Sequence, residues 1–356
     1  MIENHFNKSV MLPFLAFYHR KNKLNFIFSP VNFKLYERPK SLYLFNHSMD
    51  NALFLTDMNL DFPDKVTLIE VGPRDGFQFE TRIIPTDLKI EIISCLVNAG
   101  IKEIQITSFV HPRLVPQMAD AEALLKRLPK KKDVTYSGLA LNSMGVERAH
   151  SAGLNHIEIS ISASDTHSRK NSGMSFEQAF ENGKMMVRLA QKYNMHIRAG
   201  IQCAFGCVFE GKISQEKIVK MTRNFLDWGV DMIAISDTTG MATPVDITNL
   251  MEKLTPITVN TPIILHLHDT RGLGLVNVTA AMACGITHFD TALAGMGGCP
   301  FIPGAAGNIA TEDTAYLMEA LKIETGIDIK AVSLCSSKLE DFMGKRFPGK
   351  MYPIMR

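Results

Sequence analysis

Short apolar segments alternate with longer amphipathic segments along most of the chain from Lys65 onward. The short segments are rich in Val and Ile, which is typical of strands, and they lie at 66–71, 102–107, 134–140, 156–161, 197–203, 231–236, 262–268 and 287–292. The longer segments have a helical period and lie at about 86–99, 117–128, 143–152, 175–193, 214–228, 244–254, 273–284 and 311–322. This pattern predicts eight successive strand–helix units.

Turn and capping residues mark many of these boundaries. Glycines that suit a left-handed C-cap follow four predicted helices, at Gly100, Gly153, Gly229 and Gly285. Prolines stand at or just before helix starts, at Pro85, Pro116 and Pro244. Ser175 and Ser214 are expected to cap the helices that follow them, and Ser175 with Gln178 forms a capping box.

Eight strand–helix units over residues 65–322 predict an α/β fold, a TIM (β/α)8 barrel. A doubly wound sheet is the alternative, but the segment Gly72–Gly76 after the first strand lacks its glycine fingerprint. Residues 323–356 are expected to form a short C-terminal helical extension, with one helix at about 330–345.

Residues 1–64 differ from the rest of the chain. Residues 1–48 hold seven Lys or Arg against two Glu, and their aromatic residues follow neither a helical nor a strand period. We expect a flexible arm or a non-native extension, with Met49 or Met58 as a natural first residue. An ordered appendage and a targeting segment are the alternatives.

Composition narrows the functional classes. The 356 residues are 46% hydrophobic and 21% charged, and the net charge of +2 gives no indication of nucleic-acid binding. Six cysteines without a C-x-x-C pair predict no disulfide framework, so a reducing, cytoplasmic location is expected. No stretch is long and apolar enough to predict a membrane span.

Polar residues cluster at the carboxyl ends of the predicted strands, where barrel enzymes place their active sites. These residues are Arg74, Asp75, Gln105, Thr107, Ser108, Asn142, Ser160, Ser162, Gln202, Cys203, Ser236, Asp237, Thr238, His266, His268 and Asp269. Together they indicate a functional site at this end of the barrel.

His266 and His268 are two residues apart on one strand, so their side chains leave the same face. With Asp75, Asp237 and Asn308 expected nearby, they favour a divalent metal site over a pair of core histidines. A mixed set of His and oxygen ligands favours Mg²⁺ or Mn²⁺ over a closed zinc site.

Two further groups are candidates for chemistry. Arg74 is permanently charged and suits stabilisation of an enolate or carboxylate, with a structural ion pair as the alternative. Cys299 lies in a glycine-rich loop, 295–307, that is typical of a mobile flap, and it suits an acid or a nucleophile. Cys203 and Cys207 are expected to pack in the barrel, with a disulfide or a metal site as the alternatives.

The segments VGPRDGFQ, TSFV, VPQMAD, HLHDTRG, GMGGCPF and GAAGNIATED occur in an order and spacing that resemble the 3-hydroxy-3-methylglutaryl-CoA lyase family, a group of metal-dependent TIM-barrel lyases with a pyruvate carboxyltransferase-like domain. The resemblance covers about residues 65–330. It implies retro-Claisen cleavage of a 3-hydroxyacyl-CoA to acetyl-CoA and a keto acid, and a role in leucine degradation. It implies the metal ligands Asp75, His266, His268 and Asn308, with Arg74 and Cys299 as catalytic residues and His266 or Cys299 moving protons.

The chain departs from the family pattern in two places. Gln105 stands where the family usually has Glu, and the run RDGFQFE has Phe77 and Phe79 in place of Leu and Asn. Gln105 is therefore expected to determine specificity by donating an amide hydrogen bond to a different substrate, such as a bulkier or less polar 3-hydroxyacyl-CoA. The alternative is a slow hydroxymethylglutaryl-CoA lyase whose turnover Gln105→Glu would raise. Substrate contacts are also expected from Gln78, Ser108, Asn142, Asp237, Thr238, Arg169 and Lys170, the last two as partners of the coenzyme A phosphates.

Two other functions remain open at this point. A Claisen-type condensing acyltransferase, similar to isopropylmalate or homocitrate synthases, would share the RDG and H-x-H features but usually has further C-terminal domains. A degenerate, non-catalytic barrel is the third possibility. A small-molecule acyl-CoA substrate, no nucleic-acid or membrane partner, and a homodimer are expected.

Overall fold

The computed structural model describes residues 12–20, 23–31, 62–298 and 306–356 of the chain. The chain divides into two compact units, Met1–Leu60 and Asp61–Arg356. In the first unit, β1 (Leu12–Arg20) and β2 (Lys23–Val31) form an antiparallel hairpin. This hairpin was not predicted, because the aromatic residues of the segment show no strand period.

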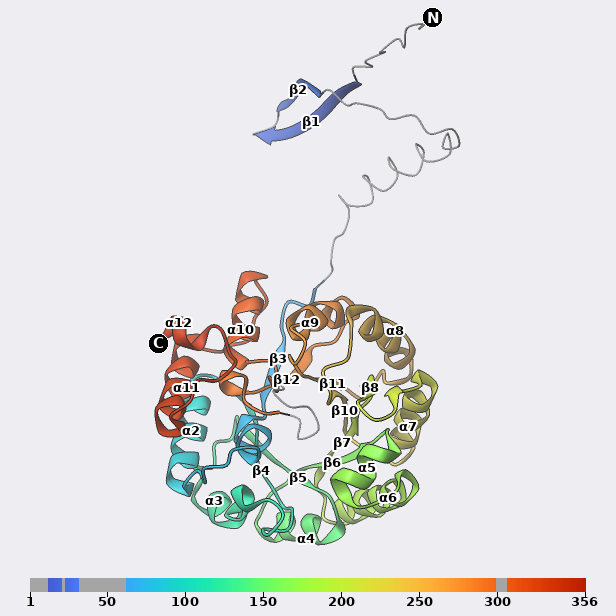
Figure 1. Ribbon diagram of the computed structural model, residues 1–356, viewed down its shortest axis with the longest axis vertical. Coiled ribbons are helices and arrows are strands. Elements are labelled where there is room, and N and C mark those ends of the chain that lie inside the picture. The colour runs from blue at the N-terminus through green and yellow to red at the C-terminus, as the bar shows by residue number, and fades with distance from the viewer. Residues whose placement is uncertain (1–11, 21–22, 32–61, 299–305) are drawn as a thin grey trace, which may run out of the picture. The chain divides into compact units, whose positions relative to one another are not determined.

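The second unit contains a closed barrel of eight parallel strands, which confirms the predicted TIM barrel (Figure 1). The strands are β3 (Thr67–Glu70), β4 (Glu103–Ser108), β5 (Thr135–Ala140), β6 (His156–Ser162), β7 (His196–Gln202), β10 (Met232–Asp237), β11 (Ile263–Leu267) and β12 (His288–Thr291). β3 pairs with β12 and closes the barrel. All eight predicted strands are present, with ends that shift by a few residues.

A ring of helices surrounds the barrel (Figure 1). The helices that follow the eight strands in turn are α2 (Thr86–Asn98), α3 (Ala121–Arg127), α4 (Ser143–Ser151), α6 (Phe176–Lys192), α7 (Gln215–Asp227), α8 (Pro244–Leu254), α9 (Gly274–Ala283) and α10 (Thr311–Ala320). The predicted extension forms α11 (Ile329–Met343), which packs on α2, and the short α12 (Tyr352–Met355) follows.

Several short elements were not predicted. They are the π-helical turn η1 (Gly72–Gly76), the 3-10 turns η2 (Pro116–Met118), η3 (Thr255–Ile257) and η4 (Leu293–Gly295), the helix α5 (Asp165–Ser172), and the small hairpin of β8 (Gly206–Cys207) and β9 (Gly211–Lys212). Of these, η1 and α5 follow β3 and β6 and carry side chains that line the site.

Alternation along the strands separates two environments. On β6, Ile157, Ile159 and Ile161 join the apolar core between the sheet and the helices. Their neighbours Glu158 and Ser160 leave the opposite face, toward the barrel interior. The interior therefore carries polar groups that the outer core excludes.

Most of the helix caps that the sequence predicts are present in the structure. Ser175 and Gln178 form the predicted capping box, and Gly100, Gly153, Gly229 and Gly285 all have positive φ. The Ser214 hydroxyl accepts no capping bond from α7, which differs from the prediction; it donates to Glu216. None of the described helices is long and apolar enough to cross a membrane.

One disulfide joins the described residues Cys95 on α2 and Cys335 on α11, 240 positions apart. The sequence predicted no disulfide framework, and it did not anticipate this single bond between distant helices. Cys203 and Cys207 are buried, which agrees with a packing role.

Candidate active site

Three potential metal ligands converge at the carboxyl end of the barrel. Asp75 lies in η1 after β3, His266 lies on β11, and His268 follows β11. Their ligand atoms lie within 4.8 Å of one another, and the Nε2 atoms of the two histidines are 3.1 Å apart. The predicted convergence of the two imidazoles with Asp75 is therefore observed.

Asn308 completes the set. Its Nδ2 donates to Asp75 Oδ2 at 2.7 Å and to the Met296 carbonyl at 3.0 Å. Its Oδ1 is buried and has no hydrogen-bond partner in the described part of the chain. A buried carbonyl oxygen needs a partner. Two imidazole nitrogens, a carboxylate and this oxygen fit a divalent cation with mixed nitrogen and oxygen ligands.

Asp290 on β12 orients His266. The His266 Nδ1 lies 2.9 Å from Asp290 Oδ2, so Nδ1 carries the proton and Nε2 faces the other ligands. Burial lowers the pKa of His266, but the carboxylates of Asp290 and Asp75 outweigh it and raise the pKa overall. Burial and the neighbouring His266 lower the pKa of His268 to about 3, which keeps its ring neutral.

Arg198 on β7 compensates the charge of Asp290. Two guanidinium nitrogens of Arg198 donate to the two carboxylate oxygens of Asp290, one of them at 2.9 Å. Asp290 is fully buried, and this pairing helps to hold its pKa well below the ordinary value despite burial. Neither residue was predicted, although charged residues inside apolar strands are the signal that would have found them.

Arg74 is fixed on both sides in the π-helical turn. Its Nε donates to Gln105 Oε1, and another guanidinium nitrogen donates to Asp75 Oδ1. Burial would raise the pKa of Asp75, but Arg74 and the two histidines outweigh it and lower that pKa. Arg74 therefore forms the buried ion pair that was considered, and it also faces the cavity described next.

A cavity of about 1090 Å³ opens over these groups. Among the predicted site residues, its lining includes Arg74, Asp75, Gln78, Asn142, Thr238, His266 and His268. The strand-end residues Ser160, Gln202 and Ser236 line it too, as do Glu158, His167 and the exposed apolar side chains of Phe79, Ile83 and Leu114. Gly298 borders it, whereas the predicted flap residue Cys299 lies outside the described residues.

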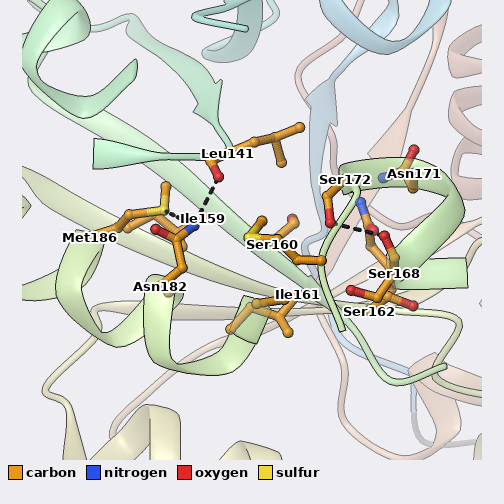
Figure 2. A pocket seen from close by; sticks show the side chains of 14 residues that line it. Leu141, Ile159, Ser160, Ile161, Ser162, Ser168, Asn171, Ser172, Asn182 and Met186 are labelled. Carbon is orange, nitrogen blue, oxygen red and sulfur yellow. Dashed lines mark hydrogen bonds between the residues drawn. The ribbon is translucent and has the colours of Figure 1, made fainter. Parts of the chain in front are cut away.

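A smaller cavity of about 20 Å³ lies between β6, α5 and α6 and shares Leu141, Ser160 and Asn182 with the larger one. Figure 2 shows Asn182, from α6, whose Nδ2 donates to the Leu141 carbonyl at 3.1 Å. The two cavities are therefore neighbours beside β6, and the smaller one is lined by both polar and apolar side chains.

Three other residues that were predicted to contact or select the substrate, Asp237, Ser108 and Gln105, lie outside the cavity lining. Asp237 accepts bonds from the amides of Met241 and Ala242, and burial raises its pKa to about 6. Ser108 is fully buried and does not line the cavity. The amide of Gln105 is also fully buried and donates to Glu158, not toward the cavity as expected for a substrate contact.

The basic pair on α5 also lies apart from the cavity lining. Arg169 pairs with Asp165 one helical turn away, and the Lys170 ammonium lies 5.1 Å from the centre of the Phe209 ring. Their neighbours His167 and Asn171 line the cavity instead.

The chain is similar to known lyases over nearly the whole barrel. The HMGL-like family model matches residues 65–338. A hydroxymethylglutaryl-CoA lyase of Bacillus subtilis (strain 168) is 37% identical over 297 residues, which cover 83% of this chain and 99% of the relative. The mitochondrial hydroxymethylglutaryl-CoA lyase of Homo sapiens is 38% identical over 268 residues, 75% of this chain and 82% of the relative.

Solved structures agree. An HMG-CoA lyase from Acinetobacter baumannii, in complex with coenzyme A and 3-methylmalate, is 38% identical with a TM-score of 0.78, covering 82% of this chain and 95% of that chain. The carboxyl transferase domain of Rhizobium etli pyruvate carboxylase shares the fold alone, at 15% identity and a TM-score of 0.60, covering 82% of this chain and 51% of that chain. The chain therefore belongs to the HMGL-like family and is a carbon–carbon lyase.

Proposed function

We propose that this protein is a divalent-metal-dependent lyase that cleaves hydroxymethylglutaryl-CoA, or a close analogue, to acetyl-CoA and a keto acid such as acetoacetate. The observation that carries the proposal is the convergence of Asp75, His266 and His268, with the unpartnered Asn308 Oδ1, beside Arg74. This set occurs in a chain that is similar to hydroxymethylglutaryl-CoA lyases over most of its length.

Asp75, His266, His268 and Asn308 would hold the cation. Bound there, Mg²⁺ or Mn²⁺ would act as a Lewis acid toward substrate oxygens. Asp290 fixes the His266 tautomer, Arg74 orients Asp75, and the Met296 carbonyl accepts from Asn308, so hydrogen bonds hold three of the four proposed ligands in place.

The proposed reaction breaks the C2–C3 bond of the acyl chain. The C3 hydroxyl loses its proton and becomes the ketone of the keto acid, while the electron pair of the broken bond passes to the thioester as an enolate. Arg74 lines the cavity and cannot lose its proton, so its guanidinium stabilises the negative charge as it forms. Protonation of the enolate carbon then gives acetyl-CoA.

We assign the proton transfers to His266 or Cys299. His266 presents Nε2 to the cavity because Nδ1 is bonded to Asp290. Gln78, Asn142 and Thr238 line the cavity and are proposed to contact the acyl group. The coenzyme A moiety would enter through the mouth near Leu114. Binding of its phosphates by Arg169 and Lys170, a homodimer, a cytoplasmic location and a role in leucine degradation stay predictions.

The condensing acyltransferase is not favoured, because the relatives that match this chain at 36–38% identity are lyases. The degenerate barrel is not favoured either, since the complete ligand set is buried and arranged around one point.

The proposal is tested with chelator-stripped full-length enzyme. Acetyl-CoA release from a panel of 3-hydroxyacyl-CoA thioesters, hydroxymethylglutaryl-CoA among them, is followed before and after addition of Mg²⁺ or Mn²⁺. Release that depends on the added metal supports the lyase. Formation of a longer acyl-CoA from acetyl-CoA and a keto acid, without cleavage of any thioester in the panel, would replace it by the condensing reaction.

A further inference from the structure

A buried carboxylate, Glu158, lies in the barrel interior and has no part in the mechanism above. It is 5% exposed and borders the cavity from the middle of β6. Its Oε1 accepts a hydrogen bond from Ser160 at 2.6 Å, and its Oε2 accepts one from Gln105 Nε2 at 2.7 Å. An uncompensated charge at such a depth would be strongly destabilising, so these partners must be matched to it.

Gln105 connects this carboxylate to the Arg74 guanidinium. Its Oε1 accepts from Arg74 Nε, while its Nε2 donates to Glu158. A carboxylate can only accept and a guanidinium can only donate, so only one orientation of the Gln105 amide satisfies both neighbours. The three side chains form one polar relay from β6 through β4 to the turn that carries Arg74.

The backbone of β7 leaves space for Glu158 and Ser160 at Gly200. A Cβ on Gly200 of β7 would lie 2.2 Å from Ser160 Oγ and 3.1 Å from Glu158 Oε1. Any other residue at position 200 would displace the pair, so glycine makes room for it. Arg198, on the same face of β7, lies with its Nε 3.2 Å from Glu158 Oε2.

The charges around Glu158 favour its ionised form. Burial raises the pKa of this carboxyl, but Arg198 and Arg74 outweigh burial and lower the pKa overall, against an opposing contribution from Asp290. The carboxylate therefore supplies negative charge to the site without making a direct contact with Arg74.

We infer that Glu158 is a positioning residue for Arg74, which it acts on through Gln105. In this chain the carboxylate that supports Arg74 is Glu158 on β6, and the residue between them, at position 105, is an amide. A carboxylate in place of that amide would lie 2.7 Å from Glu158, where two like charges repel. The inference rests on the proposed function, since Arg74 is the group that stabilises the enolate.

The test exchanges the carboxylate and the amide between the two positions. Gln105→Glu, Glu158→Gln and the double variant are compared with wild type for metal-dependent cleavage of hydroxymethylglutaryl-CoA, with kcat and KM measured separately. Each single variant should lose kcat by up to about 10²-fold with a smaller change in KM, because a misplaced Arg74 fails mainly in the transition state.

The double variant should recover most of the lost kcat. In it, the carboxylate on β4 accepts directly from Arg74, and the amide on β6 donates to that carboxylate, so one charge and one connected relay remain. The same amide nitrogen then faces Arg198 Nε, a cost that is limited because Arg198 keeps its two hydrogen bonds to Asp290. A double variant no more active than the weaker single variant, or a Glu158→Gln enzyme with wild-type kcat, would overturn the inference. Glu319→Gln, a change on the exposed face of α10, serves as the control and should match wild type.

Thermal melting of the same variants separates this inference from the proposed function. The single variants should melt several degrees below wild type, and the double variant close to it, whatever substrate the enzyme uses. If the double variant recovers the wild-type melting temperature but the wild-type enzyme does not cleave hydroxymethylglutaryl-CoA, the proposed function is refuted and the paired relay is supported. Cleavage by wild type without recovery in the double variant would refute the relay alone.

Discussion

Replacing Asp290 by asparagine should weaken metal binding although Asp290 is not itself a proposed metal ligand. Asp290 Oδ2 lies 2.9 Å from His266 Nδ1, and both of its oxygens accept from Arg198. An asparagine keeps the size of the side chain but offers one acceptor and one donor. Its amide nitrogen must therefore face either the Arg198 guanidinium or the His266 Nδ1–H, and both of those donate.

The expected losses of metal affinity and of stability follow from the two hydrogen-bond partners of Asp290, which are His266 and Arg198. Loss of the carboxylate behind a metal-binding histidine typically lowers metal affinity by about 10–100-fold. Breaking a buried ion pair typically lowers stability by about 3–5 kcal/mol, and the lower end applies here because Arg198 keeps Glu158 as a second partner. Both effects should be present in one variant.

Isothermal titration of the chelator-stripped protein with Mn²⁺ measures the first effect, and urea unfolding of the metal-free protein measures the second. Asp227→Asn, on the outer helix α7, is the matched control and should change neither quantity. If Asp290→Asn bound Mn²⁺ with wild-type affinity, Asp290 would not orient His266, and the argument from the hydrogen-bond geometry would be wrong.

Four further outcomes are expected. His268→Ala should lose measurable Mn²⁺ binding while circular dichroism shows an intact fold; retained stoichiometric binding would remove His268 from the site. Burial raises the pKa of Glu312 to about 7, so the folded chain binds that proton more tightly than the unfolded chain, and stability should fall as pH rises from about 4.5 to about 7. Glu312→Gln should flatten this fall in urea titrations at pH 5 and pH 8, and an unchanged slope would contradict it. Cys335→Ser should lower the free energy of unfolding by about 2–4 kcal/mol, and dithiothreitol should bring wild type to the same level but leave the variant unchanged. A chain that starts at Asp61 should equal the full chain in melting temperature and turnover, and a lower melting temperature would show that the first unit stabilises the barrel.

The barrel could be predicted from the sequence because two periods repeat along it. Strand segments such as 231–236 have an apolar centre between polar ends, and the helices between them carry one apolar stripe, so each unit is recognisable without its neighbours. The helix α5 was missed because its eight residues, DTHSRKNS, contain no apolar stripe. The Cys95–Cys335 pairing was missed because nothing local links positions 240 residues apart.

The site was predictable where it follows the strand ends. Asp75 and His268 stand at that position, and the fold brings them together. Glu158, Arg198 and Asp290 lie within their strands, where apolar neighbours suggest only packing. Whether charged side chains from two strands contact each other inside the barrel depends on the order and stagger of the strands. The sequence of a single strand does not determine this arrangement.

The proposed cation ligands lie on the two sides of the seam at which the barrel closes. Asp75 follows the first barrel strand, whereas Asn308 follows the last, and their side chains meet across 233 positions of sequence. β3 is synthesised long before β12, and the two strands pair only after β12 has been made. Folding intermediates that form before this pairing therefore lack the complete ligand set and cannot bind the ion with the native geometry. Metal uptake should thus be a late event in folding, and it reports that the seam has closed.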